Sequence, residues 1–192
     1  MKDRESTPSG RFFKRSVRIK ENMVIKVIQA DITKLGKDID AIVNAANESL
    51  LGGGGVDGAI HHAAGPELLK ECMTLNGCKP GEAKVTKAYK LPYKYIIHTV
   101  GPRYWSDPNP PKTLESCYLN CLKIADELGL ETIVFPSIST GVFGYPVREA
   151  ATVVAKVLTS YKAKSLKTVY MCIYFDDETA NIYNSIISEF KK

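Results

Sequence analysis

Several features that mark membrane, secreted or disulfide-rich proteins are missing from this chain. No apolar run is long enough to span a bilayer, and no apolar secretory segment follows the start of the sequence. The five cysteines are scattered without a CxxC pair, at positions 72, 78, 117, 121 and 172. Their odd number and spacing argue against a disulfide scaffold and favour a reducing compartment. We therefore expect a cytoplasmic protein.

Motifs of metal enzymes and of P-loop nucleotide enzymes are also absent. None of the three histidines stands in a metal-binding spacing such as HExxH, and the sequence GxxxxGK followed by Ser or Thr does not occur. Cys117 and Cys121 lie four residues apart on a predicted helix face, where packing in the core explains them better than chemistry. From the sequence we expect no metal site and no cofactor.

The positive charge of the chain is confined to its first residues. The net charge is +5, but residues 1–20 carry seven basic and two acidic side chains, and the rest carries equal numbers of each. A body without excess positive charge is unsuited to nucleic acid. We expect residues 1–22 to form a basic, flexible arm. A targeting segment is the alternative, but the acidic residues Asp3 and Glu5 argue against it. Residues 23–192 then form one monomeric domain with a single core.

Apolar periodicity divides the rest of the chain into alternating strands and helices. Strands are expected over residues 23–29, 40–44, 83–89, 94–100, 132–135 and 167–175. Helices are expected at 56–64, from Pro66 to the Asn76-Gly77 stop, around 114–128, from Pro146 to about 161, and after the Asp176-Asp177 cap. This order predicts an α/β domain with helices on both faces of a largely parallel sheet.

Two glycine-bearing loops follow strands of this predicted sheet. The first holds Gly52 to Gly55, and no Lys or Arg occurs from Ala41 to Leu69. Glycines let backbone N–H groups approach a ligand closely, which favours anion binding here. The second loop covers residues 137–145. Because ligands bind at the carboxyl ends of parallel strands, we expect the two loops to face each other across one cleft.

The segment from Gly53 to Gly58 matches the dinucleotide fingerprint GxGxxG in its residue types but not in its position relative to the strands. In that fingerprint the glycines come directly after the strand, and an acidic residue about twenty positions later ends a second strand. Here loop residues intervene, and the nearest candidate, Glu71, falls inside a predicted helix. We therefore reject a nicotinamide-dependent dehydrogenase.

Five motifs follow one another along residues 23–190: DIT at 31–33, NAAN at 44–47, GGGVDGAIH at 53–61, HTVGP at 98–102 and STGVFGYP at 139–146. In order and spacing they resemble the MacroD-like branch of the macrodomain family. The resemblance implies a three-layer α/β/α fold with a mixed, largely parallel sheet that binds ADP-ribose. It also implies a hydrolase that removes ADP-ribose from acidic side chains of mono-ADP-ribosylated proteins and deacetylates O-acetyl-ADP-ribose.

The resemblance assigns adenine to Asp31, whose carboxylate would accept from the exocyclic amine, and to the N–H of Ile32. On the residues alone, Asp31 serves equally well as the cap of the following turn. The family usually has glycine before this aspartate, whereas this chain has Ala30, so the loop is expected to sit slightly differently. Phe175 is placed beside adenine by its position in the family, with core packing as the alternative.

The resemblance places the pyrophosphate between the two glycine loops. Backbone N–H groups at helix N-termini can bind phosphates without a lysine. The residues concerned are Gly54, Gly55, Val56, Ser139, Thr140, Gly141, Val142 and Phe143. Phe143 would also cover the distal ribose.

The distal ribose and its scissile C1″ bond are assigned by the resemblance to Asn47 and Asp57. Asn47 can both donate and accept, which suits a ribose hydroxyl or the attacking water. Asp57 falls in the first turn of a helix, so we expect its pKa to be ordinary or low. Such a group is a poor base, and we expect it to orient a water while the substrate's phosphate helps to accept a proton.

Asn44 and His61 are expected to support the site. Asn44 would brace the loop through bonds from its side chain to the backbone. His61 shares a helix face with Asp57, and we favour a role in holding the loop over one as catalytic base. The alternative function is a non-catalytic reader of ADP-ribose. Binding-only members of the family often lack the aspartate found here at position 57, so its presence favours the enzyme.

Overall fold

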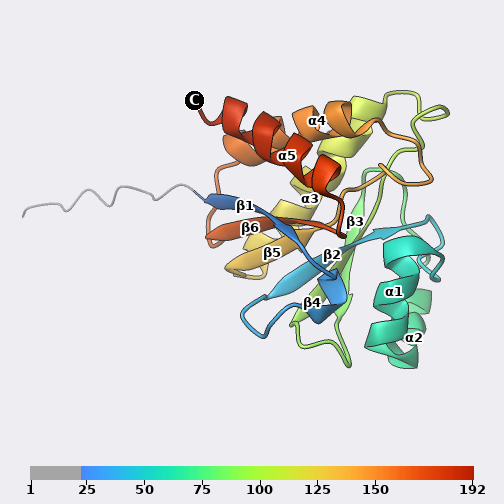
Figure 1. Cartoon of the computed structure of the whole chain (residues 1–192). Coiled ribbons are helices and arrows are strands. Elements are labelled where there is room, and N and C mark those ends of the chain that lie inside the picture. The colour runs from blue at the N-terminus through green and yellow to red at the C-terminus, as the bar shows by residue number, and fades with distance from the viewer. Residues whose placement is uncertain (1–22) are drawn as a thin grey trace, which may run out of the picture.

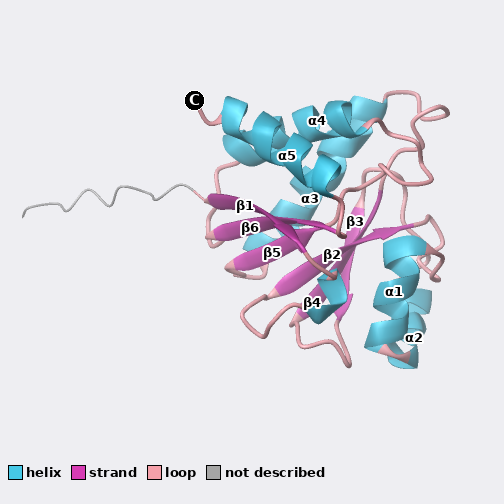
Figure 2. Ribbon diagram, viewed as in Figure 1, coloured by secondary structure: helices cyan, strands magenta, loops and turns pink. Residues whose placement is uncertain are grey.

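A six-stranded mixed sheet separates two layers of helices in the computed structural model, which describes residues 23–192 (Figures 1 and 2). The expected basic arm, residues 1–22, lies outside this range. The strands are β1 (Val24–Gln29), β2 (Ala41–Ala46), β3 (Ala83–Lys87), β4 (Tyr95–Val100), β5 (Thr132–Phe135) and β6 (Thr168–Ile173). Their order is β1-β6-β5-β2-β4-β3, and only β3 runs antiparallel to its neighbour. The expected α/β/α fold with a largely parallel sheet is confirmed.

The helices cover both faces of the sheet, as the alternating pattern predicts. Helices α1 (Gly55–Ala64) and α2 (Pro66–Thr74) pack on one face, and α3 (Pro110–Glu127), α4 (Val147–Ser160) and α5 (Asp177–Phe190) pack on the other. A short 3-10 helix, η1 (Ile32–Lys34), follows β1. Within residues 23–192, no helix combines the length and apolar character needed to cross a bilayer.

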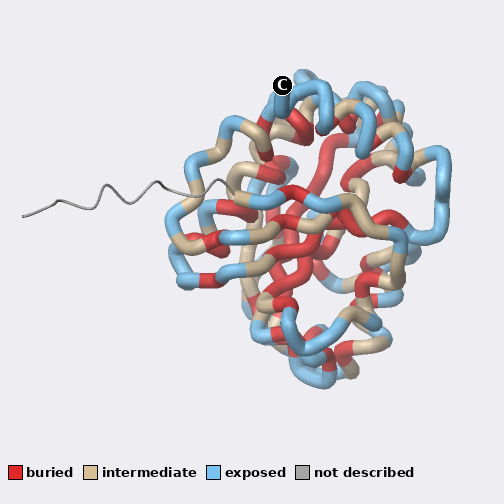
Figure 3. The backbone as a smooth tube through the Cα atoms, turned by 60° about the vertical axis from the view of Figure 1, so that its left-hand side comes forward, coloured by how far each residue is buried: buried red, intermediate tan, exposed pale blue. Residues whose placement is uncertain are grey.

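Strand β2 lies in the middle of the sheet and is buried from Ala41 to Asn44 (Figure 3). Alternate side chains of a strand point to opposite faces. Accordingly, Val43 packs with the α3–α5 layer, whereas Ile42 and Ala46 pack with the α1–α2 layer. Asn44 has the same parity as Ile42 and therefore faces α1. This places a polar side chain inside the core, next to the N-terminal turn of that helix.

Most predicted boundaries hold within a residue or two, but the last strand is shorter than expected. Strand β6 ends at Ile173 instead of residue 175. The N–H of Phe175 donates to the carbonyl of Ile173 in a tight turn, and Phe175 has a φ of 42°. The chain therefore leaves the sheet early, so that Asp176 can cap α5 through its bond from the Thr179 N–H.

One buried carboxylate ties the end of α3 to the connection that precedes β6. Asp126 accepts hydrogen bonds from the hydroxyl of Tyr161 at 2.6 Å and from the backbone N–H groups of residues 164–166. Burial opposes ionisation of this carboxyl, but the hydrogen bonds outweigh it and hold its pKa below the ordinary value. The charged form is therefore the stabilising one.

Replacing Asp126 with asparagine should lower the free energy of unfolding at pH 7 by about 2 kcal/mol, because an amide nitrogen cannot accept these bonds. A group with a depressed folded-state pKa stabilises above its unfolded pKa and loses that effect as pH falls through the folded value. The difference between wild type and Asp126→Asn should therefore shrink below about pH 4. Urea unfolding across this range measures it, with the exposed Asp38→Asn as control. If Asp126→Asn lowers the free energy of unfolding by the same amount at all pH values, the charged form of Asp126 is not the stabilising one.

Candidate functional site

A cleft of about 1000 Å³ opens at the carboxyl ends of the parallel strands. Its walls are the glycine loop with the start of α1, and the loop from Pro136 to Phe143. The two glycine-bearing loops thus face each other across one cleft, as expected from the sequence. The predicted residues found in its lining are Asp31, Ile32, Asn47, Gly54, Gly55, Val56, Asp57, Ser139, Thr140, Gly141, Val142 and Phe143.

The second loop presents a row of free backbone donors to the cleft. Among residues 23–192, no acceptor is found for the N–H groups of residues 139–143. Ser139 adopts a φ of 67°, a left-handed conformation that is uncommon for a residue other than glycine. The loop is braced from behind, where Ser137 hydrogen bonds to Thr140 and to the hydroxyl of Tyr183 on α5. Five consecutive unpaired N–H groups make a ready anion-binding surface.

Two of the helix N-termini at the cleft, those of α1 and α4, have no side-chain cap. Helix α1 begins after Gly54 and α4 after Pro146, and neither residue supplies a capping hydrogen bond. By contrast, the side chain of Asn109 caps α3, and the side chain of Asp176 caps α5, whose N-terminus also borders the cleft. An uncapped N-terminus leaves N–H groups and the positive end of the helix dipole available for an anion.

Two glycines allow the walls of the cleft to approach closely. A Cβ at Gly58 would collide with the backbone carbonyl of Gly53, which packs the glycine loop onto α1. A Cβ at Gly101, directly after β4, would collide with Ser139. One glycine in each of the GGGVDG and HTVGP motifs is therefore required by close packing between elements, whatever its role toward a ligand.

Asp57 is held by a buried polar network that runs across the sheet. The Nδ2 group of Asn44 donates to Asp57 Oδ1 at 2.8 Å and lies 3.1 Å from His98 Nδ1. The Nε2 group of His98 lies 2.9 Å from Thr86 Oγ1, which donates to the carbonyl of Lys87. The prediction that Asn44 bonds to loop backbone was wrong. Its partners are side chains, because the register of β2 and β4 pairs it with His98.

The protonation of this network follows from its geometry. Burial, together with the nearby His61, lowers the pKa of His98 to about 3, so the imidazole is neutral at physiological pH. Both Asn44 amide protons are directed to acceptors when His98 Nδ1 carries no proton. His98 Nε2–H must then donate to Thr86. Each donor fixes the orientation of the next group, and Asp57 stands at the end.

The pKa of Asp57 differs from the sequence-based prediction. Burial raises it above the ordinary value, against the opposing effects of the Asn44 hydrogen bond and of His61. The prediction of an ordinary or low pKa was wrong because it considered the helix dipole and not the burial of the side chain, which is 4% exposed. A raised pKa makes Asp57 a stronger base than expected.

The side chains of Asn47 and Asp57 both lie close to Gly53. A Cβ placed on Gly53 would lie 3.1 Å from Asp57 Oδ2 and 3.4 Å from Asn47 Nδ2. Asn47 also holds its own loop, because Nδ2 donates to the carbonyl of Gly52 and Oδ1 accepts from the N–H and hydroxyl of Ser49. One amide proton of Asn47 stays free of these bonds. The two side chains named for catalysis therefore lie together at one end of the cleft.

His61 lies between the glycine loop and Asp57. Its ring packs under Gly52, and its Nε2 atom lies 3.5 Å from Asp57 Oδ1. The contact with Gly52 agrees with a role in holding the loop, and its part in the chemistry stays a prediction.

The adenine end of the predicted site is only partly as expected. Asp31 lines the cleft and also caps η1, since its Oδ1 accepts from the N–H and hydroxyl of Thr33. Ala30 is not among the residues with positive φ, so the alanine in place of glycine imposes no strain. Phe175 is exposed and does not line the cleft, whereas Tyr174 does. The stacking role given to Phe175 stays a prediction, and Tyr174 is its competitor.

Sequence reasoning missed two residues of the site. His98 falls inside the predicted strand 94–100 and was given no role, although it belongs to the network that positions Asp57. Arg103 was not considered, yet its guanidinium lies 4.3 Å from the centre of the Phe143 ring and it is the cleft's one basic side chain among residues 23–192. The only signal in the sequence was its place two residues after the Gly101 strand stop.

Replacing Asn44 with alanine should raise the pKa of Asp57 further, because the hydrogen bond that favours the charged form is lost. The pKa of Asp57 is lower in the unfolded chain than in the folded protein. Ionisation of Asp57 therefore destabilises the fold as pH rises from the unfolded pKa through the folded pKa. The cost of Asn44→Ala should thus grow with pH and reach about 1–3 kcal/mol at pH 7.

Carbon-13 chemical shifts of the Asp57 carboxyl during a pH titration measure the first effect, and urea unfolding measures the second. Asn120→Ala is the matched control, because Asn120 donates to the carbonyl of Gly81 outside the cleft. An unchanged Asp57 titration in Asn44→Ala would show that Asn44 does not control this carboxyl.

Comparison with known proteins agrees with the geometry. Residues 43–154 match the family model described as Macro domain. The chain is 46% identical over 176 residues to O-acetyl-ADP-ribose deacetylase of Citrobacter rodentium, covering 88% of this chain and 97% of that protein. It is 48% identical over 167 residues to ADP-ribose glycohydrolase MACROD1 of Bos taurus, covering 84% of this chain and 50% of the relative.

A solved structure shares the fold at similar coverage. A variant of the Oceanobacillus iheyensis macrodomain with ADPR superimposes with a TM-score of 0.79 at 40% identity, covering 86% of this chain and 92% of the other. The sheet order, the cleft between two glycine loops and these similarities lead to one conclusion. This chain belongs to the macrodomain family.

Proposed function

We propose that this protein is a hydrolase that binds ADP-ribose and cleaves ADP-ribosyl esters, both on Asp or Glu side chains of mono-ADP-ribosylated proteins and in O-acetyl-ADP-ribose. One observation carries the proposal. The cleft joins a row of five unpaired backbone N–H groups to a buried carboxylate, Asp57, which converges with the Asn47 amide over Gly53. The names of the relatives, an O-acetyl-ADP-ribose deacetylase and an ADP-ribose glycohydrolase, support the same reaction class.

The anion-binding half of the cleft would hold the pyrophosphate. N–H groups of residues 139–143 and the uncapped start of α1 supply the donors. Arg103 adds one guanidinium, held over the ring of Phe143. The nucleoside would extend toward Asp31 and Ile32, and the distal ribose toward Asn47 and Asp57.

The chemical step would use water and the two groups over Gly53. Asn47 orients the ribose or the water through its free amide proton, and Asp57 accepts a hydrogen bond from that water. Water oxygen bonds to C1″ while the C1″–O bond to the acyl group breaks and the acyl group leaves as a carboxylate. The proton passes to Asp57 or to the substrate's phosphate. For O-acetyl-ADP-ribose, water adds to the acetyl carbon and the bond between that carbon and the ribose oxygen breaks. The ribose oxygen takes up a proton and becomes a hydroxyl, and the acetyl group is released as acetate.

The runner-up function is a reader that binds ADP-ribose without turnover. The raised pKa and fixed orientation of Asp57 favour the enzyme, because neither property is needed for binding alone. We further propose a monomeric, cytoplasmic protein without a nucleic-acid partner. The neutral body argues against a nucleic-acid partner, and the unpaired state of all five cysteines supports the cytoplasmic location.

Asp57→Ala should lower kcat by about 100-fold or more, the usual contribution of a positioned acid or base, while ADP-ribose affinity changes by less than about tenfold. Asn47→Ala should also lower kcat. Release of free ADP-ribose from a peptide carrying a glutamate-linked ADP-ribose measures turnover, and calorimetry measures affinity. Asp38→Ala, outside the cleft, is the control.

Two results would overturn the proposal. Full turnover by an Asp57→Ala protein that binds ADP-ribose normally would remove Asp57 from the mechanism. Tight binding of ADP-ribose by the wild-type protein with no release of product would establish the reader.

A further inference from the structure

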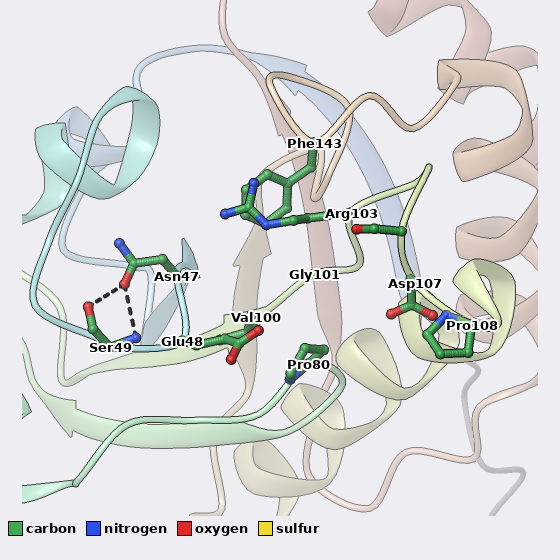
Figure 4. Close-up of a pocket in the computed structure, with 11 residues that line it drawn as sticks. Asn47, Glu48, Ser49, Pro80, Val100, Gly101, Arg103, Asp107, Pro108 and Phe143 are labelled. Atoms are coloured by element: carbon green, nitrogen blue, oxygen red, sulfur yellow. Dashed lines mark hydrogen bonds between the residues drawn. The ribbon is translucent and has the colours of Figure 1, made fainter.

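A second, smaller cavity of about 410 Å³ adjoins the cleft at its catalytic end (Figure 4). Four residues line both cavities, namely Asn47, Gly101, Arg103 and Phe143. Beyond this shared boundary the smaller cavity is lined by Glu48 and Ser49 on one side and by Asp107 and Pro108 on the other. It therefore begins at Asn47, where the scissile bond of the proposed substrate would lie.

The charge of the smaller cavity differs from that of the cleft. Glu48 and Asp107 line it and take part in no ion pair among residues 23–192. Asp107 uses Oδ1 to accept from the Asn109 N–H and the Thr113 hydroxyl, which leaves Oδ2 free. Arg103, the one basic residue of the lining, is held over Phe143 on the boundary with the phosphate-binding cleft.

The rim of this region has the character of a protein-binding surface. Each of the three surrounding loops carries a large exposed apolar side chain, with exposed fractions of 49% for Leu51, 86% for Trp105 and 99% for Val142. Exposed aromatic and apolar side chains on loops that border a cavity are typical of contacts with a macromolecule. Leu51 and Trp105 do not line the larger cleft, and only the backbone N–H of Val142 is assigned to ADP-ribose, so these side chains stay available for another partner.

We propose that the smaller cavity receives the peptide segment that flanks the ADP-ribosylated carboxyl side chain, and that Glu48 and Asp107 select a segment with a basic neighbour. The inference rests on the proposed function, since the leaving group must depart past Asn47. Two carboxylates without a cationic partner favour Lys or Arg in the bound segment and disfavour Glu. The acetyl group of O-acetyl-ADP-ribose carries no peptide and is too small to reach Glu48 and Asp107 together.

The test compares three substrates. Two synthetic peptides carry the same glutamate-linked ADP-ribose and differ in one adjacent residue, Lys or Glu, and O-acetyl-ADP-ribose is the third. Each exposed charge pair is worth a modest factor, so wild type should show a kcat/KM about 3- to 10-fold higher for the Lys peptide. The isosteric double variant Glu48→Gln, Asp107→Asn should lose this preference and keep its kcat/KM for O-acetyl-ADP-ribose. Glu189→Gln on α5 is the matched control and should retain the preference.

The outcomes separate the two proposals. Three results would overturn the peptide subsite. Wild type could show equal kcat/KM for both peptides, or the double variant could keep the Lys preference. The double variant could also lose as much kcat/KM for O-acetyl-ADP-ribose as it loses for the Lys peptide. If wild type hydrolyses none of the three substrates, the hydrolase proposal fails. The subsite is then decided by peptide affinity, measured through the fluorescence of Trp105, the only tryptophan of the chain. A Lys preference lost in the double variant supports it, and equal affinities overturn it.

Discussion

The arrangement of this site depends on keeping one carboxylate buried and oriented. A carboxylate taken out of water is costly unless hydrogen bonds compensate it, and Asp57 receives its buried hydrogen bond from Asn44 alone among residues 23–192. That bond requires Asn44 to face α1 from the central strand, His98 to stay neutral beside it, and Gly58 to let the glycine loop close over the helix. The cost of burial is what raises the pKa of Asp57 and gives it basic strength.

The other wall of the cleft would bind the pyrophosphate of the proposed substrate with few formal charges. The lining contains the carboxylates of Asp31, Asp57 and Asp176 and one guanidinium, so side-chain charge does not favour a pyrophosphate. Backbone N–H groups and helix ends must supply the attraction. This arrangement keeps cations away from the glycine loop and leaves the charge of Asp57 unpaired by lysine or arginine. Arg103 is held over Phe143 at the boundary with the second cavity.

Local patterns were sufficient to predict the fold. Periodicity and capping residues, which act over a few positions, predicted the strands 132–135 and 94–100 and the cap at Asp176. The motifs likewise placed Asn47 and Asp57 in one cleft. The network behind Asp57 could not be predicted, because it depends on the register that sets Asn44 beside His98, and register is a property of the assembled sheet. The early end of β6 and the outward Phe175 result from a tight turn that the apolar run Tyr174-Phe175 conceals.

The pH dependence of kcat/KM tests the central claim most directly, namely that a buried, hydrogen-bonded Asp57 acts as a charged base. Turnover of O-acetyl-ADP-ribose by the wild-type protein should fall on the acid side with an apparent pKa above 3.8, the ordinary value for aspartate, and this acid limb should disappear in Asp57→Asn along with most of the rate. The same acid limb in Asp57→Asn, or a rate in wild type that stays constant down to pH 4, would contradict the account.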